Sequence, residues 1–480
     1  MGLLLVTATG ICSMMGASIN VIPFMIQKNV PGIGPYVVPA FLFAAIPAIF
    51  AAYAYAILSS AMPRAGGSYL YASRGLSPYL GFIASFSQWF GLSIVIGVIS
   101  YIIVPFIRDV FFNLGFINIS DFLEVGSVRL TISLLLIWFF VLINIVGGKV
   151  YKNTLIPMLV IMFVLGSIVL ITGLVYDQND FINSVLNSEN RVIKPISDIK
   201  FDLKIFLTAA TLMFSSFIGF DAIAQTGNEA KNPTKNIPRA ILLAIFIVAS
   251  YYILFTISVY NIVPWSFVAD ESITKDITAP GLLSYVLPPF WGILIIIGAA
   301  IALINDLPAM ILSVSRLMFA WAKDNIFPNR VALIHSKFNT PYIAIILVGV
   351  VASIGAIGSH FAGDFFLGID IMVTSMMINF LLMCVTLISI QKVNFKLFKN
   401  ITVIKNRAIQ LFIGYTGTLI ILIFLIIHTY KDLSSNVEEW YFHSTYIYLI
   451  VMIIASIYFA LRWKTVQVKN NKTFKTLPVE

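Results

Sequence analysis

The sequence contains few charged residues for its length. Only 11% of the 480 residues are charged, whereas 59% are hydrophobic and the mean hydropathy is +0.96. Soluble globular proteins carry about 25% charged residues, and a dozen long apolar runs do not fit into one soluble core. The runs are also continuous rather than alternating, which excludes a membrane β-barrel. The composition therefore predicts an all-α polytopic membrane protein.

Signatures of enzymes are missing. The sequence contains no His-Glu-x-x-His, Cys-x-x-Cys, Walker or dinucleotide-binding glycine motif, and its four histidines fall in expected loops or at span ends. We therefore expect no enzymatic activity, no metal and no cofactor, apart from a coupling H⁺ or Na⁺, and any transport would be driven by gradients. Cys12 and Cys384 lie within apolar runs and are interpreted as small buried side chains rather than as a disulfide.

Long apolar runs divide the chain into twelve expected spans, since about 20 apolar residues cross a bilayer as a helix. The first run has no preceding basic residues and is longer than a signal-peptide core, so it is expected to be a retained span. The twelve spans are expected at residues 2–26, 33–58, 79–107, 130–146, 154–175, 205–226, 240–263, 289–319, 342–357, 365–390, 409–427 and 446–461.

The distribution of basic residues gives the orientation. Most of the 30 lysines and arginines fall in the loops on the side of the N-terminus, which predicts cytoplasmic termini and a multi-pass protein of the cell membrane. This bias also explains the net charge of +9, so we expect contact with the lipid bilayer and no nucleic-acid partner. The expected regions are a transport core (1–390), a basic cytoplasmic linker (391–408), two peripheral spans (409–462) and a basic cytoplasmic tail (463–480).

Small residues interrupt the first expected span at Met15, Gly16, Ala17 and Ser18. They allow the helix to unwind, which frees backbone N–H groups at the start of the following half-helix, where a substrate carboxylate can bind. The alternative is close packing of helices through small residues. A matching interruption five helices later favours a binding site.

That second interruption lies in the sixth expected span. Ser215, Ser216 and Gly219 stand in the middle of an apolar helix, where free carbonyl groups can accept hydrogen bonds from a substrate amino group. Phe214 and Phe220 are candidates for the pocket wall or a gate. Asp221 could contact a cation or carry a proton, or it could hold the broken helix by accepting backbone hydrogen bonds.

Three segments carry a resemblance to a known family. One segment resembles the sixth span of amino acid–polyamine–organocation permeases. It contains Phe-Ile-Gly-Phe-Asp (217–221), then Glu-Ala-Lys-Asn-Pro (229–233) and Ile-Pro-Arg-Ala-Ile (237–241). Residues 63–71 and the segment after the eighth span resemble the corresponding loops of the same family. The resemblance implies a five-plus-five inverted-repeat core of the LeuT type with two added helices.

The resemblance also implies an inner-gate role for the loop that contains Arg64, Gly66 and Gly67, whereas the residues alone could form only a sharp turn with an interfacial aromatic anchor. The sequence departs from the family at Ser18 and Asn20. No lysine occurs between residues 153 and 190. Some proton-coupled members use a lysine in that span, so their coupling device is not transferred to this chain.

Asp306 is the most unusual acid of the sequence, since it stands deep in the eighth expected span. It could bind a coupling proton, a sodium ion together with Ser313, or a basic group of the substrate, or it could pair with another helix. Asp370 begins a polar stripe in the tenth span and raises the same question of a cationic substrate.

These features predict a secondary transporter of amino acids or related amines, present as a monomer or homodimer. The first alternative is an antiporter of polyamines or cationic amino acids on the same fold. The second is a sensor that binds an amino acid without transporting it. A channel is disfavoured because no ring of charged pore residues is evident.

Overall fold

The fold is known from a computed structural model that describes residues 1–16, 18–193, 199–227, 229–274, 276–362, 366–437, 439–470 and 473–477. Within these ranges every regular element is helical. Twelve helical segments of the described chain are long and apolar enough to cross a bilayer, so each of the twelve predicted spans is confirmed.

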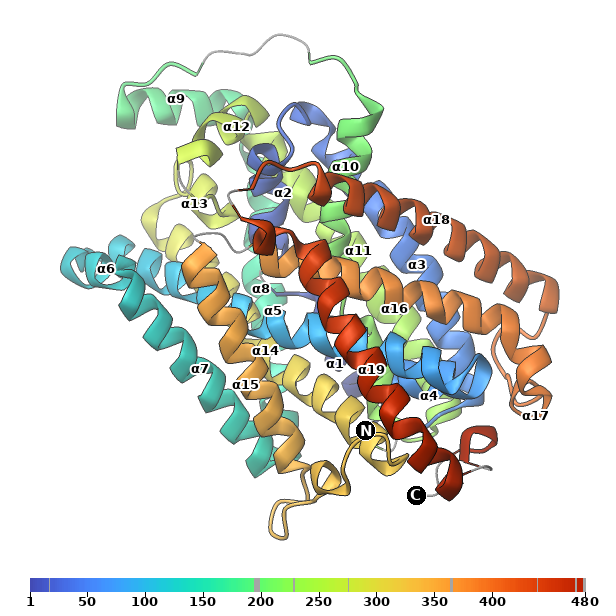
Figure 1. Ribbon diagram of the computed structural model, residues 1–480. Coiled ribbons are helices and arrows are strands. Elements are labelled where there is room, and N and C mark those ends of the chain that lie inside the picture. The colour runs from blue at the N-terminus through green and yellow to red at the C-terminus, as the bar shows by residue number, and fades with distance from the viewer. Residues whose placement is uncertain are drawn as a thin grey trace.

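The spanning helices follow one another as an α-helical bundle (Figure 1). The first and sixth spans are each composed of several shorter pieces, and the other ten are single helices. The helices are α1 (Leu3–Met14), α2 (Ser18–Asn29), α3 (Val37–Ala61), α5 (Pro78–Asn113), α7 (Gly126–Val146), α8 (Gly148–Val175), α10 (Leu203–Met213), η2 (Phe214–Phe217), η3 (Phe220–Thr226), α11 (Pro233–Ile262), α14 (Pro289–Lys323), α15 (Tyr342–Ala362), α16 (Phe366–Val393), α18 (Arg407–Leu433) and α19 (Ser444–Asn470).

Short helices cover the two ends of the bundle. Both chain termini lie at one end, here called the termini end, where the backbone of Lys231 bonds to Met1 and Arg74 bonds to Thr476. The opposite end, here called the cap end, carries α9, α12 and α13 at the top of Figure 1. The short helices are η1 (Gly34–Tyr36), α4 (Gly67–Gly75), α6 (Ile117–Glu124), α9 (Gln178–Glu189), α12 (Trp265–Thr274), α13 (Ala279–Leu283), η4 (Asn329–Ala332), α17 (Phe395–Phe398), η5 (Trp440–Phe442) and η6 (Thr473–Lys475).

Helix α9 lies in the segment between the fifth and sixth spans. Phe181 of α9 is fully buried, and its ring lies 5.0 Å from Phe267 and 5.4 Å from Tyr285. Asp177 caps the helix by accepting hydrogen bonds from Asn179 and Asp180. The two buried residues of α9, Phe181 and Val185, are four positions apart and therefore lie on one face of the helix. This apolar face explains why the otherwise polar segment packs against its neighbours.

Helix α5 crosses the bundle as its central element. Its first residue is Pro78, and Ser77 accepts a hydrogen bond from the Leu80 backbone, so the sequence fixes where the helix begins. At Gly97 the helix passes so close to α15 that an added Cβ atom would overlap the carbonyl oxygen of Ala352. Gly355 of α15 meets the Ile94 carbonyl in the same way. Small residues thus let the two backbones touch, as is common between membrane helices.

Candidate functional site

The first span is interrupted where the sequence predicts unwinding. Helix α1 ends at Met14 and α2 begins at Ser18. The Gly16 amide bonds to the Met14 carbonyl at 3.1 Å instead of continuing the helical pattern. Ala17 lies outside the described residues, and the structure describes the backbone of Ser18 but not its side chain. The break leaves the N-terminus of α2 pointing at the interior of the bundle, where its positive dipole end favours a negative group.

The sixth span is interrupted at the matching position. Helix α10 ends at Met213, and the chain continues through two 3₁₀ segments that Ile218 and Gly219 separate. Ile218 is extended, and Gly219 has a φ of +131°, a conformation that side chains other than glycine rarely adopt. The span therefore changes direction at Gly219.

Asp221 holds this second break together. Its Oδ1 atom accepts a hydrogen bond from the Gly219 amide at 3.2 Å, and its Oδ2 atom accepts one from the side chain of Gln88. Asp221 does not line the pocket described below. Of the roles that the sequence left open, this geometry favours the structural one.

The two breaks meet in the centre of the bundle. An added Cβ atom at Gly219 would overlap the carbonyl oxygen of Ser13, so the two backbones are in contact. The hydroxyl of Tyr252, from α11, donates a hydrogen bond to the Met14 carbonyl. This carbonyl lies at the end of α1, where no further helical turn would satisfy it. The contacts hold both irregular segments against each other.

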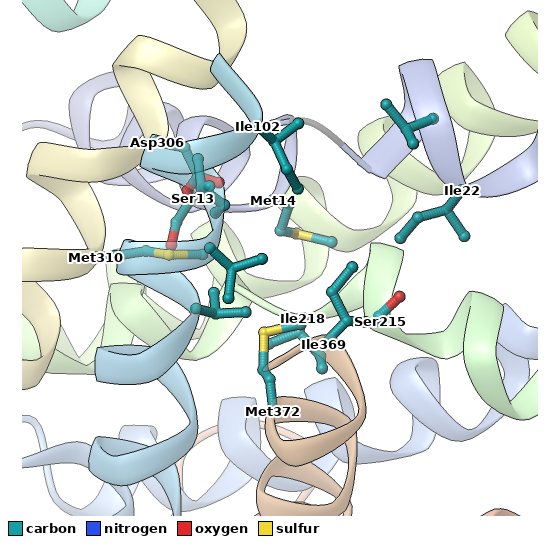
Figure 2. Close-up of a pocket in the computed structure, with 14 residues that line it drawn as sticks. Ser13, Met14, Ile22, Ile102, Ser215, Ile218, Asp306, Met310, Ile369 and Met372 are labelled. Carbon is teal, nitrogen blue, oxygen red and sulfur yellow. The ribbon is translucent and has the colours of Figure 1, made fainter. Parts of the chain in front are cut away.

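A cavity of about 50 Å³ lies between these breaks and the helices α5, α14 and α16 (Figure 2). Oxygen-bearing side chains line it at Ser13, Ser215 and Asp306, and every other lining side chain is apolar. The complete lining is Ser13, Met14, Val21, Ile22, Val95, Val98, Ile99, Ile102, Ser215, Ile218, Asp306, Met310, Ile369 and Met372. We call this cavity the central pocket.

Only two of the residues that the sequence singled out line the central pocket, Ser215 and Asp306. Of the others, the loop with Arg64, Gly66 and Gly67 lies at the termini end, and Ala17 is outside the described residues. Met15 lines a separate, smaller cavity with Asn20 of α2 and residues of α8, α11 and α14. Phe214 meets the ring of Phe380 edge-to-face at 6.0 Å, Phe220 stacks on the same ring at 5.0 Å, and neither side chain lines the pocket. Ser216 is buried without a hydrogen-bond partner for its hydroxyl.

Sequence reasoning missed the apolar walls of the pocket. Val95, Val98, Ile99 and Ile102 follow one face of α5 at helical spacing, but apolar residues also occupy the other faces of this part of the helix. The pattern therefore could not separate this face from faces that touch lipid or other helices. Ser13 carried a weak signal, since it precedes the interruption that the sequence located.

Asp306 lies near the middle of α14 and is 3% exposed. Its Oδ2 atom lies against Gly16, so closely that an added Cβ atom there would overlap it. Its Oδ1 atom has no hydrogen-bond partner, and no side chain in the described part of the chain forms an ion pair with it. Ser313 is buried as well, with an unpartnered hydroxyl, but it does not line the pocket. A buried acid of this kind is costly and marks a place where a cation can bind.

No metal centre accompanies this acid in the residues that the structure describes. Among them, no group of three or more histidine, cysteine, aspartate or glutamate side chains could hold a metal ion. Backbone carbonyl and hydroxyl oxygens are the remaining donors at the pocket, and these suit a proton or an alkali cation better than a transition metal.

A larger cavity of about 480 Å³ opens beyond the central pocket toward the cap end. Val21 and Ile102 line both cavities, so these two side chains form the boundary between them. The larger cavity, which we call the vestibule, is rich in charge of both signs. Its charged residues are Arg108, Asp109, Asp121, Glu124, Arg129 and Asp276.

The loop with Arg64, Gly66 and Gly67 lies at the termini end, against the sixth span. The Gly66 amide donates a hydrogen bond to Gln225 Oε1 at 3.2 Å, and Gly67 lies against the amide of the same side chain. Gly227 packs on the backbone of Arg64. The loop is therefore fixed to η3, the segment that follows the break.

Helix α4 continues from this loop and pairs with the end of α14. Arg74 Nη1 lies 2.6 Å from Asp324 Oδ2, and both side chains are buried. The Tyr69 hydroxyl donates to the same carboxylate at 2.5 Å. Burial alone would lower the pKa of Arg74, but the Asp324 carboxylate and Tyr69 outweigh it and raise the pKa, so the guanidinium stays charged. This cluster ties α4 to the end of α14 at the termini end.

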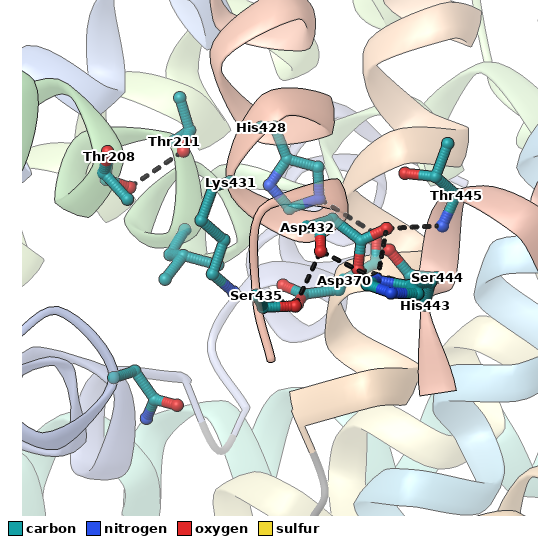
Figure 3. A network of polar contacts seen from close by, with 12 residues as sticks. Thr208, Thr211, Asp370, His428, Lys431, Asp432, Ser435, His443, Ser444 and Thr445 are labelled. Carbon is teal, nitrogen blue, oxygen red and sulfur yellow. Dashed lines mark hydrogen bonds and ion pairs between the residues drawn. The ribbon is translucent and has the colours of Figure 1, made fainter. Parts of the chain in front are cut away.

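A second polar network joins the last spans at the cap end (Figure 3). Lys431 Nζ of α18 lies 3.1 Å from Asp370 Oδ2 of α16, and His428 contacts the Asp370 carbonyl. Asp432 accepts hydrogen bonds from the amides of Ser444 and Thr445 and so caps α19. Asp370 does not line the central pocket. Its charge is balanced by Lys431, which weakens the argument that Asp370 serves a cationic substrate.

Comparison with known proteins links this architecture to one family. The family model described as amino acid permease matches residues 1–457. Among curated proteins, the chain is 28% identical over 150 residues to a branched-chain amino acid permease of Bacillus subtilis, a match that covers 31% of each chain. It is 34% identical over 152 residues to an uncharacterized transporter of Mycobacterium tuberculosis, covering 31% of this chain and 33% of the other.

A third relative is the cationic amino acid transporter 4 of Mus musculus, which is 28% identical over 151 residues, covering 32% of this chain and 23% of the relative. The matched segments span a third or less of the length of these relatives. They therefore indicate common ancestry rather than a shared substrate.

Proposed function

Because the chain belongs to the amino acid permease family of the amino acid–polyamine–organocation superfamily, we propose that it moves amino acids across the cell membrane by gradient-driven alternating access. Membership of the family makes the chain a multi-pass membrane transporter rather than an enzyme. Its relatives include a branched-chain amino acid permease and a cationic amino acid transporter, which supports an amino acid as the substrate.

The observation that carries the proposal is the meeting of two broken spans at a buried pocket. In this proposal the substrate carboxylate binds the free amides at the start of α2, which begins at Ser18 after the break that follows Met14. The substrate ammonium binds near Ser215 and the unwound carbonyls that follow α10. The polar head is thus held by peptide groups, as in other transporters built on discontinuous helices.

Charge distribution supports an orientation with both termini in the cytoplasm. The basic loops and the tail lie at the termini end, and the positive-inside rule assigns this end to the cytoplasm. The vestibule then opens to the outside. The loop with Gly66 and Gly67, together with the Arg74–Asp324 pair, closes the cytoplasmic side as the inner gate. Residues 1–390 form the transport core in this proposal, and residues 409–462 form a peripheral pair.

Asp306 is our candidate for coupling. Its carboxylate touches the break of the first span and has an unpartnered oxygen, so a proton or a sodium ion that binds there would act directly on the substrate site. Binding of a cation to one state and not the other is what couples a gradient to movement. The protein would work as a monomer or a homodimer.

Counterflow in proteoliposomes tests the proposal. Vesicles that contain the purified protein and a high internal concentration of one amino acid should accumulate the same labelled amino acid, and empty vesicles should not. Gly219→Ala should abolish counterflow, because Gly219 has a positive φ and touches the Ser13 carbonyl. Gly358→Ala is the matched control, since an added Cβ atom at Gly358 meets nothing within 4 Å. Equal counterflow by both variants would contradict the proposed site.

Two alternatives give different results in the same vesicles. An antiporter of polyamines or cationic amino acids, which the unpaired Asp306 carboxylate favours, would exchange putrescine or arginine faster than alanine. A sensor would bind an amino acid, seen as thermal stabilisation of the protein, without any counterflow.

A further inference from the structure

We infer that the central pocket selects amino acids with an uncharged aliphatic or thioether side chain, of the size of valine to methionine. The inference rests on the proposed function, since it names the class of substrate that the same site would transport. It is drawn from the lining, the charge and the shape of the pocket.

The lining of the pocket is apolar on the sides that α5 and α16 provide. Val98, Ile99 and Ile102 project from α5, Ile369 and Met372 from α16, and Met310 from α14. None of these side chains can donate or accept a hydrogen bond of ordinary strength. A substrate side chain with an amide, a hydroxyl or a charge would lose its hydrogen bonds to water here without replacement. An aliphatic side chain would instead gain from leaving water.

Asp306 and Ser13 lie apart from the apolar side chains that α16 provides. In Figure 2 these two lie together at one side, whereas Ile218, Ile369 and Met372 gather at the other together with Ser215, whose hydroxyl already donates a hydrogen bond to the Leu212 carbonyl. Both Ser13 and Asp306 adjoin the break of the first span. This separation fits an amphipathic ligand whose charged head points to the break and whose apolar tail points to α16.

The charges that face the pocket allow for one cation only. Among the residues that line it, all of which the structure describes, Asp306 is the single acid. Asp370 is paired with Lys431, and Asp221 accepts hydrogen bonds from Gln88 and Gly219. Neither acid reaches the lining. Whether Asp306 holds the substrate ammonium or a coupling cation, the second positive charge of a lysine, arginine or polyamine would be left without a partner.

The walls also limit the size of the side chain. The cavity measures about 50 Å³, and Val21 and Ile102 separate it from the vestibule. Gly368 of α16 lies directly against the side chain of Val98, so α5 and α16 are in close contact beside the pocket. A bulky aromatic ring would therefore require a larger displacement of the walls than a branched or linear chain of three to four carbon atoms.

Competition for counterflow tests the inference. The panel contains alanine, valine, leucine, methionine, phenylalanine, glutamine, lysine and putrescine, together with norleucine, which has the four-carbon side chain of lysine without the ammonium group. We expect leucine, methionine and norleucine to compete at concentrations at least about tenfold below those needed for lysine and glutamine, as an apolar pocket discriminates. Alanine should be weaker than leucine by about tenfold, because each buried methylene contributes to discrimination.

Two variants locate the specificity in the pocket. Val98→Ile should narrow the cavity and weaken leucine more than alanine, whereas Ile99→Ala should widen it and admit phenylalanine. Leu135→Ala is the control, because Leu135 of α7 is 66% exposed on the outer face of the bundle. Thermal stabilisation by leucine, measured on each variant, separates a changed profile from a loss of folding.

The outcomes separate a failure of the aliphatic specificity from a failure of the proposed transport function. Stronger competition by lysine, arginine or putrescine than by norleucine would overturn the aliphatic specificity and leave amino acid or amine transport standing. An unchanged profile in both pocket variants would overturn the assignment of specificity to these walls. No competition and no stabilisation by any member of the panel would overturn the proposed function together with this inference.

Discussion

The carboxylate of Asp306 lies against Gly16, at the point where the first span loses its helical hydrogen bonds. The contact joins an acid of the eighth span to the backbone at which the substrate carboxylate is proposed to bind. Two like charges this close in a dry site cannot both be tolerated without a compensating cation. The relationship therefore provides a direct link between a bound cation and a bound amino acid.

Gly16→Ala should remove transport and lower thermal stability, because the added methyl group would overlap Asp306 Oδ2. Overpacking of a buried site costs about 1–3 kcal/mol. In an Asp306→Ala background, the same Gly16→Ala change should cost clearly less, since the overlapping atoms are gone. Melting temperatures in detergent of the wild type, both single variants and the double variant measure this coupling. Strict additivity of the two changes would show that the contact is not present.

Asp306→Asn should separate exchange from accumulation. The variant keeps the size of the side chain but can no longer be ionised, so net uptake driven by a pH or sodium gradient should fall strongly while counterflow is retained in part. Uptake by the wild type should vary with pH, and uptake by the variant should not. The measurement is initial uptake of labelled leucine at several pH values, with and without sodium. Wild-type kinetics in the variant at all pH values would dismiss Asp306 as the coupling group.

Arg74→Gln should destabilise the protein by about 3–5 kcal/mol, the cost of leaving one member of a buried ion pair alone. Arg191→Gln is the matched control at the cap end, where Arg191 Nη1 lies 2.6 Å from Glu271 but its side chain is 39% exposed. Because the Arg191 end of this pair is open to solvent although Glu271 is only 12% exposed, its loss should cost less than the loss of the fully buried pair. The fall in melting temperature should therefore be several times larger for Arg74→Gln. Similar shifts for the two variants would argue against a tight closure of the termini end.

Lys431→Gln should lower stability and leave the substrate profile unchanged. The substitution strands the Asp370 carboxylate, which is 7% exposed, at a cost of about 1–3 kcal/mol. Asp370→Asn, added to Lys431→Gln, should restore part of the lost melting temperature because the stranded charge is removed. Competition by lysine and leucine should be the same in all three proteins. A changed preference between these two amino acids would place Asp370 in the substrate path after all.

The sequence predicted those features that depend on local composition. All twelve spans follow from long apolar runs, and the interruptions at Gly16 and Gly219 follow from small residues within such runs. Asp306 stood out because an acid is rare in a membrane helix, and it does line the pocket.

Contacts between distant segments were beyond the sequence. Asp370 and Lys431 are 61 positions apart in the sequence and lie in different spans. Neither span contains a pattern that identifies the other residue as its partner. Phe214 and Phe220 were candidates for the pocket wall, but packing turns both rings toward Phe380. Much of the actual wall comes from α5, where apolar residues around the segment 94–104 give no clear signal for the face that turns inward. Rotation of helices about their axes is a tertiary property, which hydropathy alone does not encode.

The glycine crossing of α5 and α15 has a consequence for engineering. Since the backbones already touch at Gly97 and Gly355, the α5 wall cannot retreat toward α15 when a bulkier residue is introduced on its inner face. A methyl group added or removed at Val95 or Ile99 should therefore change the volume of the central pocket directly, because α5 cannot shift to compensate. A rigid wall of this kind means that single substitutions on the inner face of α5 should set the largest ligand that the pocket accepts.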